Sequence, residues 1–135
     1  MREIKRLVVH MAYTRPSMDI GVKEITEWHN ARGFNGCGYH WVIRRSGELE
    51  KGRDESVSGA HVAGHNSDSV GICLVGGRKE NEDKADCNFT LNQWNTLRSL
   101  LYDLLSKYPN AEICGHRDLA NRECPGFDAT VLMEK

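Results

Sequence analysis

The sequence predicts one α/β domain in which a central mixed β-sheet is flanked by helices. Its length of 135 residues suits a single hydrophobic core. Short apolar runs such as 70–75 are typical of buried strands, and two longer segments carry apolar residues at helical spacing. The elements are expected in the order β-α-β-β-β-α-β, with loops on both sides of the sheet.

The chain begins with a predicted strand and helix. Residues 6–12 form an apolar run that indicates a buried strand. Asp19 is expected to cap a helix over 22–32, and Gly33 is expected to end it. The apolar face of this helix is expected to carry Val22, Ile25 and Trp28.

Three further strands are expected in the middle of the chain. Residues 38–44 are rich in β-branched and aromatic side chains, and a turn at 46–47 pairs them with 48–50 in a hairpin. A polar loop over 54–68 precedes the buried strand at 70–75.

The last part of the chain contains the second helix. Thr90 and Gln93 form a capping-box pattern. The helix behind it has a leucine stripe that predicts a core-facing side: Leu97, Leu100, Leu101, Leu104 and Leu105. A strand over 111–115 follows, and a short helix is expected from Asp128 onward.

Composition excludes several classes of protein. The formal net charge is −1, and no basic stretch is interleaved with aromatic residues, so we expect no nucleic-acid binding. The apolar runs are too short for insertion into a membrane. The first residues lack the apolar segment of a secretory signal, and we expect no signal peptide.

The five cysteines are odd in number and are expected to remain thiols. Four of them are expected to be small buried apolar side chains: Cys37, Cys73, Cys87 and Cys114. Cys124 differs because it precedes a proline in a polar loop, where burial alone does not explain it.

Three residues form a candidate metal site. His116 ends the strand at 111–115, Cys124 lies eight residues further on, and His10 ends the first apolar run. Imidazole and thiolate suit zinc, and three protein ligands with one open position are typical of catalytic zinc. Taken alone, a histidine at a strand end is more often an ordinary residue, so the sequence leaves both interpretations open.

Several short motifs occur together in one order: Val9-His10, Gly38-Tyr39-His40, Gly59-Ala60-His61, the run from Val70 to Gly77, His116-Arg117-Asp118 and the run from Cys124 to Asp128. In this order the chain resembles the type-2 N-acetylmuramoyl-L-alanine amidases, which share a fold with peptidoglycan recognition proteins. In particular, it resembles the small single-domain phage endolysins. The resemblance extends from about Ile4 to Phe127.

The resemblance implies roles for seven residues. Zn²⁺ is expected to be held by His10, His116 and Cys124. Tyr39 and the residue two positions before the cysteine are expected to be catalytic. That residue is typically lysine in the phage enzymes and is Arg122 here. Arginine keeps the charge but does not readily release a proton. The residues expected to bind substrate are His61 and Asn66, although the latter also fits simple turn chemistry.

Other polar residues near these motifs receive less specific expectations. His40 alternates with Tyr39 and is expected on the opposite face of the sheet. The pair Arg117 and Asp118 is expected either to orient the metal ligands or to form a loop salt bridge. Two histidines are expected at the surface: His29 and His65.

The resemblance also implies a reaction and a setting. The expected reaction is hydrolysis of the amide between N-acetylmuramic acid and L-alanine in peptidoglycan. We expect a monomer with one catalytic domain over 1–135, no separate wall-binding domain, and a location in the host cytoplasm until lysis brings it to the wall. The alternatives are a peptidoglycan-binding module without catalysis, a thiol hydrolase using Cys124 with His116, and a glycosidase with paired carboxylates.

Overall fold

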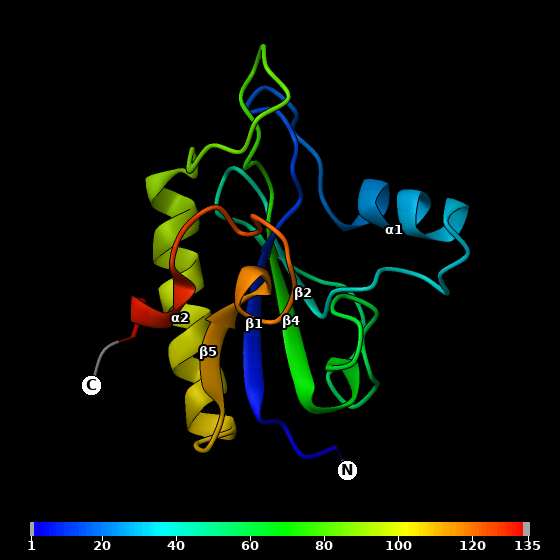
Figure 1. Ribbon diagram of the computed structural model, residues 1–135, viewed down its shortest axis with the longest axis vertical. Coiled ribbons are helices and arrows are strands. Elements are labelled where there is room, and N and C mark those ends of the chain that lie inside the picture. Colours follow the sequence, from blue (N-terminus) through cyan, green and yellow to red (C-terminus); the bar gives the residue numbers. More distant parts are fainter. Residues whose placement is uncertain (1, 134–135) are drawn as a thin grey trace.

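A five-stranded sheet with the order β3-β2-β4-β1-β5 organises the chain (Figure 1). The computed structural model describes residues 2–133. Pairing is parallel except between β2 and β3, so the sheet is mixed, as predicted. The strands are β1 (Arg6–Met11), β2 (Trp41–Ile43), β3 (Leu49–Lys51), β4 (Ser69–Leu74) and β5 (Glu112–Gly115).

Within residues 2–133, two α-helices accompany the sheet, and three short 3₁₀ turns lie in the loops. Figure 1 shows α2 running alongside the sheet on the left of the view, whereas α1 lies on the right of the sheet. The predicted last helix is the 3₁₀ turn η3, and the end of that prediction lies outside the described residues. The helices are α1 (Val22–Ala31) and α2 (Leu91–Lys107), and the turns are η1 (Asn66–Asp68), η2 (His116–Asp118) and η3 (Ala129–Val131).

The start and the buried face of α2 confirm the sequence pattern. The backbone N–H of Gln93 donates to Oγ1 of Thr90 at 3.1 Å, and the N–H of Thr90 donates to Oε1 of Gln93 at 2.9 Å. The buried leucines are Leu97, Leu100, Leu101 and Leu104, whereas Leu105 is only partly buried against the same core. Burial of each such side chain contributes about 1.5–3 kcal/mol, so this stripe fixes α2 on the sheet.

The predicted N-cap of α1 is wrong. The cap residue is Gly21, and the exposed Asp19 instead accepts a hydrogen bond from Arg44 at 2.9 Å. The acceptor for the first turn comes from β3, where Oε1 of Glu50 receives the N–H of Val22 at 2.8 Å. A Cβ on Gly21 would lie 2.1 Å from that oxygen, so the small residue makes room for the distant carboxylate.

The buried face of α1 also differs from the prediction. Its buried residues are Ile25 and His29, which are four positions apart, whereas Trp28 remains 42% exposed. The expectation that His29 lies at the surface is therefore wrong, because the helix turns that position toward the segment that carries Gly38 and Tyr39. Gly33 follows the helix with φ +91°, a conformation that favours glycine, and ends it as predicted.

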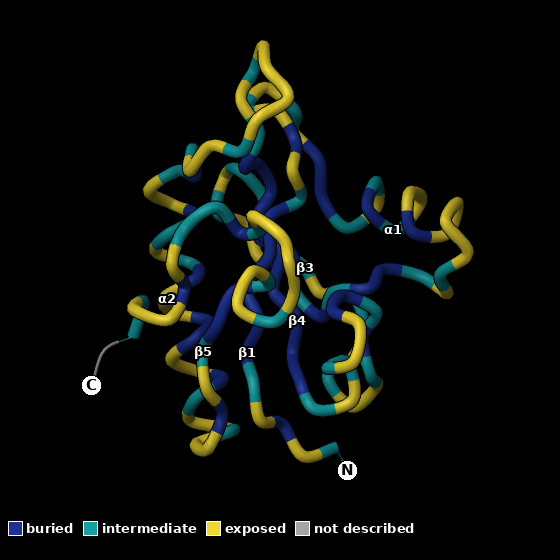
Figure 2. Tube along the Cα trace, viewed as in Figure 1, coloured by how far each residue is buried: buried dark blue, intermediate teal, exposed yellow. Residues whose placement is uncertain are grey.

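Burial is concentrated in the central strands, and the loop at 78–88 extends into solvent (Figure 2). The prediction of buried thiols is confirmed for Cys37, Cys73 and Cys114. It is wrong for Cys87, which is exposed in this polar loop. Within residues 2–133, no helix combines the length and the apolar character needed to cross a membrane.

The two faces of β1 have different neighbours. Leu7 and Val9 pack into the core beneath α2. Val8 and His10 alternate with them and therefore point to the opposite face. Because β1, β4 and β5 are parallel, their carboxyl ends meet at one edge of the sheet. His10 lies near this edge and His116 follows it directly, so the topology brings both to one place.

Candidate active site

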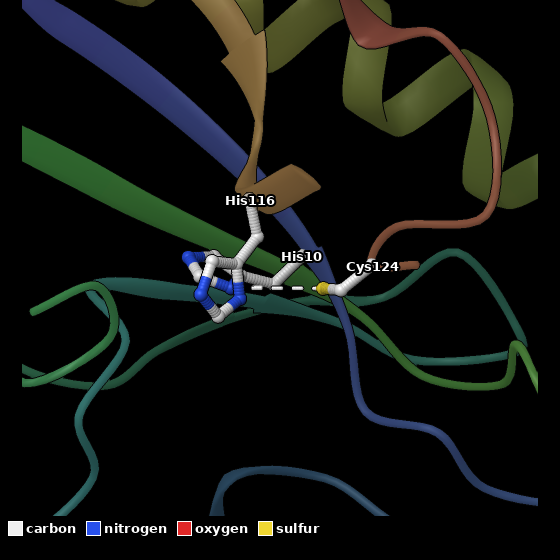
Figure 3. Close-up of side chains that lie close together, drawn as sticks. All are labelled: His10, His116 and Cys124. Atoms are coloured by element: carbon white, nitrogen blue, oxygen red, sulfur yellow. Dashed lines mark hydrogen bonds between the residues drawn. The ribbon is translucent and has the colours of Figure 1, made fainter. Parts of the chain in front are cut away.

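Three predicted site residues converge at the carboxyl edge of the sheet (Figure 3). One ligand atom from each of His10, His116 and Cys124 lies within 4.8 Å of the other two. His10 comes from β1, His116 begins the turn after β5, and Cys124 lies in the following loop. Residues far apart in sequence thus form one cluster of two imidazoles and one sulfur.

The loop that carries Cys124 is tied closely to the end of β5. The N–H of Arg117 donates to the carbonyl of Cys124 at 2.6 Å. A Cβ on Gly115 would lie 2.6 Å from Cδ of Pro125, so glycine permits this close approach. Oδ2 of Asp118 accepts the N–H of Gly115 at 2.7 Å and therefore holds the turn rather than a ligand ring.

The sulfur of Cys124 lies in a partly polar environment. Strand β5 pairs with β1 only as far as Val9, so the N–H of Met11 is left free and donates to the sulfur at 3.1 Å. Burial raises the pKa of Cys124 to about 11, although the Met11 N–H and the charge of Arg122 oppose the shift. Without a cation the group is a neutral thiol near pH 7, which argues against a nucleophilic cysteine.

The two histidines of the cluster favour their neutral forms. Burial, with smaller contributions from His61 and His116, lowers the pKa of His10 well below its ordinary value. Burial and the charge of Arg122 lower the pKa of His116. Neutral imidazoles bind metals, and a bound cation displaces the proton of a coordinating thiol. The donor set therefore suits zinc.

All seven predicted site residues line one cleft of about 830 Å³. A volume of this size is ordinary for a ligand site. Beyond the three clustered residues, the cleft is lined by the other predicted ones: Tyr39, His61, Asn66 and Arg122.

Tyr39 lies directly against His10, with ring centroids 5.0 Å apart. Burial, followed by the neighbouring thiols of Cys73 and Cys124, raises the pKa of Tyr39 well above its ordinary value. The phenol therefore keeps its proton, and the buried thiol of Cys73 lies within hydrogen-bonding reach of its hydroxyl. The adjacent His40 is fully buried, and its Nδ1 accepts the N–H of Gly71 at 2.9 Å.

The remaining predicted residues lie at different depths in the cleft. Arg122 is exposed on the loop, where its charge acts on the nearby ligand residues. His61 is only 8% exposed and lies behind His10. Oδ1 of Asn66 accepts the N–H groups of His61 and Val62, both at 2.9 Å, so its oxygen serves the loop itself.

Sequence reasoning missed His29 as a residue of this cleft. His29 lines it and lies against Tyr39, with ring centroids 5.4 Å apart. Its Nδ1 accepts the N–H of Gly38 at 2.8 Å and so holds the segment that carries Tyr39. The spacing of four between Ile25 and His29 was the available signal, because it places both on one face of α1.

Comparison with known proteins gives a consistent result. The sequence profile of the N-acetylmuramoyl-L-alanine amidases matches residues 1–127. The endolysin of Escherichia phage T7 is 45% identical over 129 residues, which cover 96% of this chain and 85% of the phage protein.

Solved structures show the same fold. The N-acetylmuramoyl-L-alanine amidase LysC from Clostridium intestinale superposes with a TM-score of 0.79 and 29% identity, covering 94% of this chain and 79% of LysC. The Drosophila recognition protein PGRP-LB superposes with a TM-score of 0.77 and 23% identity, covering 96% of this chain and 79% of that protein. The second likeness concerns the fold alone.

Proposed function

The chain belongs to the N-acetylmuramoyl-L-alanine amidase family, and we propose that it is a zinc-dependent enzyme that cleaves the amide between N-acetylmuramic acid and L-alanine in peptidoglycan. The observation that carries the proposal is the convergence of His10, His116 and Cys124 in the cleft. Two neutral imidazoles and a sulfur are a donor set that suits catalytic zinc.

The endolysin relative supports a biological setting for this activity. We propose that the chain acts as a phage endolysin that reaches the wall from the host cytoplasm at lysis. A monomer whose residues 1–135 form one catalytic domain remains part of this proposal.

A zinc ion, when bound, would supply a Lewis acid that polarises the scissile carbonyl and activates water. The phenol of Tyr39 stays protonated and lies beside His10. These features support a role in which Tyr39 donates a hydrogen bond to the oxygen that becomes negative. Arg122 lines the same cleft and adds positive charge near that oxygen.

The arginine at position 122 restricts how protons move in this mechanism. A guanidinium remains protonated under ordinary conditions and is not interchangeable with lysine. Arg122 is therefore proposed to stabilise charge, while proton transfer to the leaving amine is left to Tyr39 or water.

Digestion of purified peptidoglycan tests the proposal. We expect new amino termini on L-alanine without new reducing sugar ends, loss of activity with a chelator, and recovery on addition of zinc. New reducing ends without amino termini would indicate a glycosidase and contradict the proposal. Retention on peptidoglycan without release of amines would instead favour the binding module.

A further inference from the structure

We propose that His61 is a positioning residue which, together with Ser69, determines which ring nitrogen of His10 carries the proton. In this arrangement the unprotonated Nδ1 of His10 faces the other proposed metal ligands, His116 and Cys124. This inference rests on the proposed zinc site and gives His61 a role different from the substrate contact expected from the sequence.

The first step is the direction of the Ser69 hydroxyl. Its Oγ lies 2.7 Å from the carbonyl oxygen of His65. A carbonyl cannot donate, so the hydroxyl proton of Ser69 must lie on this contact. Oγ is also 3.1 Å from Nε2 of His61, and here it can only accept. Nε2 of His61 therefore carries a proton.

The second step passes from His61 to His10. Burial favours the neutral form of both rings, which are 8% and 1% exposed. A neutral His61 with its proton on Nε2 has a lone pair on Nδ1. That atom lies 2.8 Å from Nε2 of His10, so Nε2 of His10 must be the donor. The proton of His10 is thereby assigned to Nε2.

The third step reaches the metal cluster. With its proton on Nε2, His10 has a lone pair on Nδ1, the atom that lies 3.8 Å from the sulfur of Cys124. A histidine ligand binds through a bare nitrogen, and donation of its other N–H to a partner fixes the ring and raises its basicity. The chain from the His65 carbonyl through Ser69 and His61 supplies that partner.

Two glycines leave room for the His61 ring. A Cβ on Gly71 would lie 2.6 Å from Cγ of His61, and a Cβ on Gly59 would lie 2.6 Å from its Cδ2. The backbone N–H of His61 is also held by Asn66 at 2.9 Å. The His61 ring is therefore tightly packed behind His10, as expected for a residue that orients a metal-binding side chain.

Nitrogen-15 NMR of the histidine rings in metal-free protein tests the proton assignment directly. We expect both His10 and His61 to carry their proton on Nε2 near pH 7.5. The ring signals are assigned with variants in which one histidine at a time is replaced. A proton on Nδ1 of either ring would overturn the proposal. This result does not depend on zinc binding or activity, so it can fail or succeed separately from the proposed function.

Zinc affinity, measured by competition with a chromophoric chelator, tests the consequence. His61→Leu removes the acceptor, and we expect zinc affinity to fall by about 10–100-fold. His61→Asn keeps an oxygen near the position of Nδ1 and should stay within a few-fold of wild type. Equal losses in both variants would contradict the acceptor role.

Ser69→Ala tests the same arrangement without changing a ring. We expect a mixture of proton positions on His61 and weaker zinc binding. Ser67→Ala is the matched control, because Ser67 is exposed two positions before Ser69. This variant should leave the proton position on His61 and the zinc affinity unchanged. Wild-type tautomers and zinc affinity in Ser69→Ala would overturn the proposal, even if His61→Leu does not fold.

Discussion

Nδ1 of His10 lies 3.8 Å from the sulfur of Cys124, although 114 positions separate the two residues in the sequence. The approach depends on β5 ending beside Val9, which frees the edge of β1 for the loop that carries Cys124. The candidate site is thus formed where a short strand leaves its longer neighbour uncovered. Its chemistry can be tested one residue at a time.

Replacement of the sulfur ligand should remove both metal and activity. In Cys124→Ser we expect zinc affinity and amide hydrolysis to fall by more than about 100-fold, because a hydroxyl is a much poorer zinc ligand than a thiolate. Zinc content and release of amino groups are the measurements. Cys87→Ser is the matched control, since Cys87 is exposed in a loop, and it should behave as wild type.

Removal of the Tyr39 hydroxyl should slow catalysis without loss of metal. We expect Tyr39→Phe to lower kcat by about 10²–10³, the usual effect of losing one hydrogen-bond donor to a developing oxyanion. Zinc content should not change. Tyr102→Phe is the control, because Tyr102 is 66% exposed on α2. Full activity of Tyr39→Phe would exclude the proposed role.

Two substitutions at Arg122 separate charge from proton transfer. If the residue acts by charge, Arg122→Lys should retain kcat within about 10-fold, and Arg122→Ala should lose about 10²-fold. Arg98→Ala, an exposed change on α2, controls for net charge. A large gain in activity for the lysine variant would show that proton transfer matters at this position.

The metal-free protein should lose stability in acid. Burial lowers the pKa of His61 from 6.5 to about 3, so the unfolded chain binds more protons between these values. The free energy of unfolding is therefore not reduced by this group above pH 6.5. As the pH falls from 6.5 toward 3, His61 lowers the free energy of unfolding by up to about 1.4 kcal/mol per pH unit.

Urea unfolding of the metal-free protein at several pH values measures this slope. His61→Asn lacks the titrating ring and should show a smaller decrease between pH 6.5 and pH 4. Identical slopes for the variant and the wild type would contradict the assignment of a low pKa to His61. Buried His40, whose pKa is also lowered by burial, should contribute in the same direction in both proteins.

The sequence was sufficient for the elements whose patterns are local. The leucine stripe and the Thr90 capping box depend on residues within one helix, and both predictions are confirmed. The N-cap of α1 was missed because its acceptor, Glu50, belongs to a strand 28 positions away. Cys87 is exposed because it lies in a polar loop that extends into solvent.

The site was predictable to the extent that it lies at strand ends. Parallel strands share one carboxyl edge, so the topology alone brings His10 near His116. The spacing of Ile25 and His29 indicated that His29 is buried, but its hydrogen bond to the N–H of Gly38 was not predictable, because Gly38 lies in another segment. The role of Ser69 was not predictable either, because it depends on how the hydroxyl lies between the His65 carbonyl and the His61 ring. Such contacts leave no periodic trace in a sequence.

Zinc K-edge X-ray absorption spectroscopy of the purified protein tests the central claim most directly. We expect one zinc per chain, bound by two imidazole nitrogens at about 2.0–2.1 Å, one sulfur at about 2.3 Å and one light-atom ligand. The sulfur contribution should disappear in Cys124→Ser. Absence of zinc, or a wild-type spectrum without sulfur, would contradict the site formed by His10, His116 and Cys124.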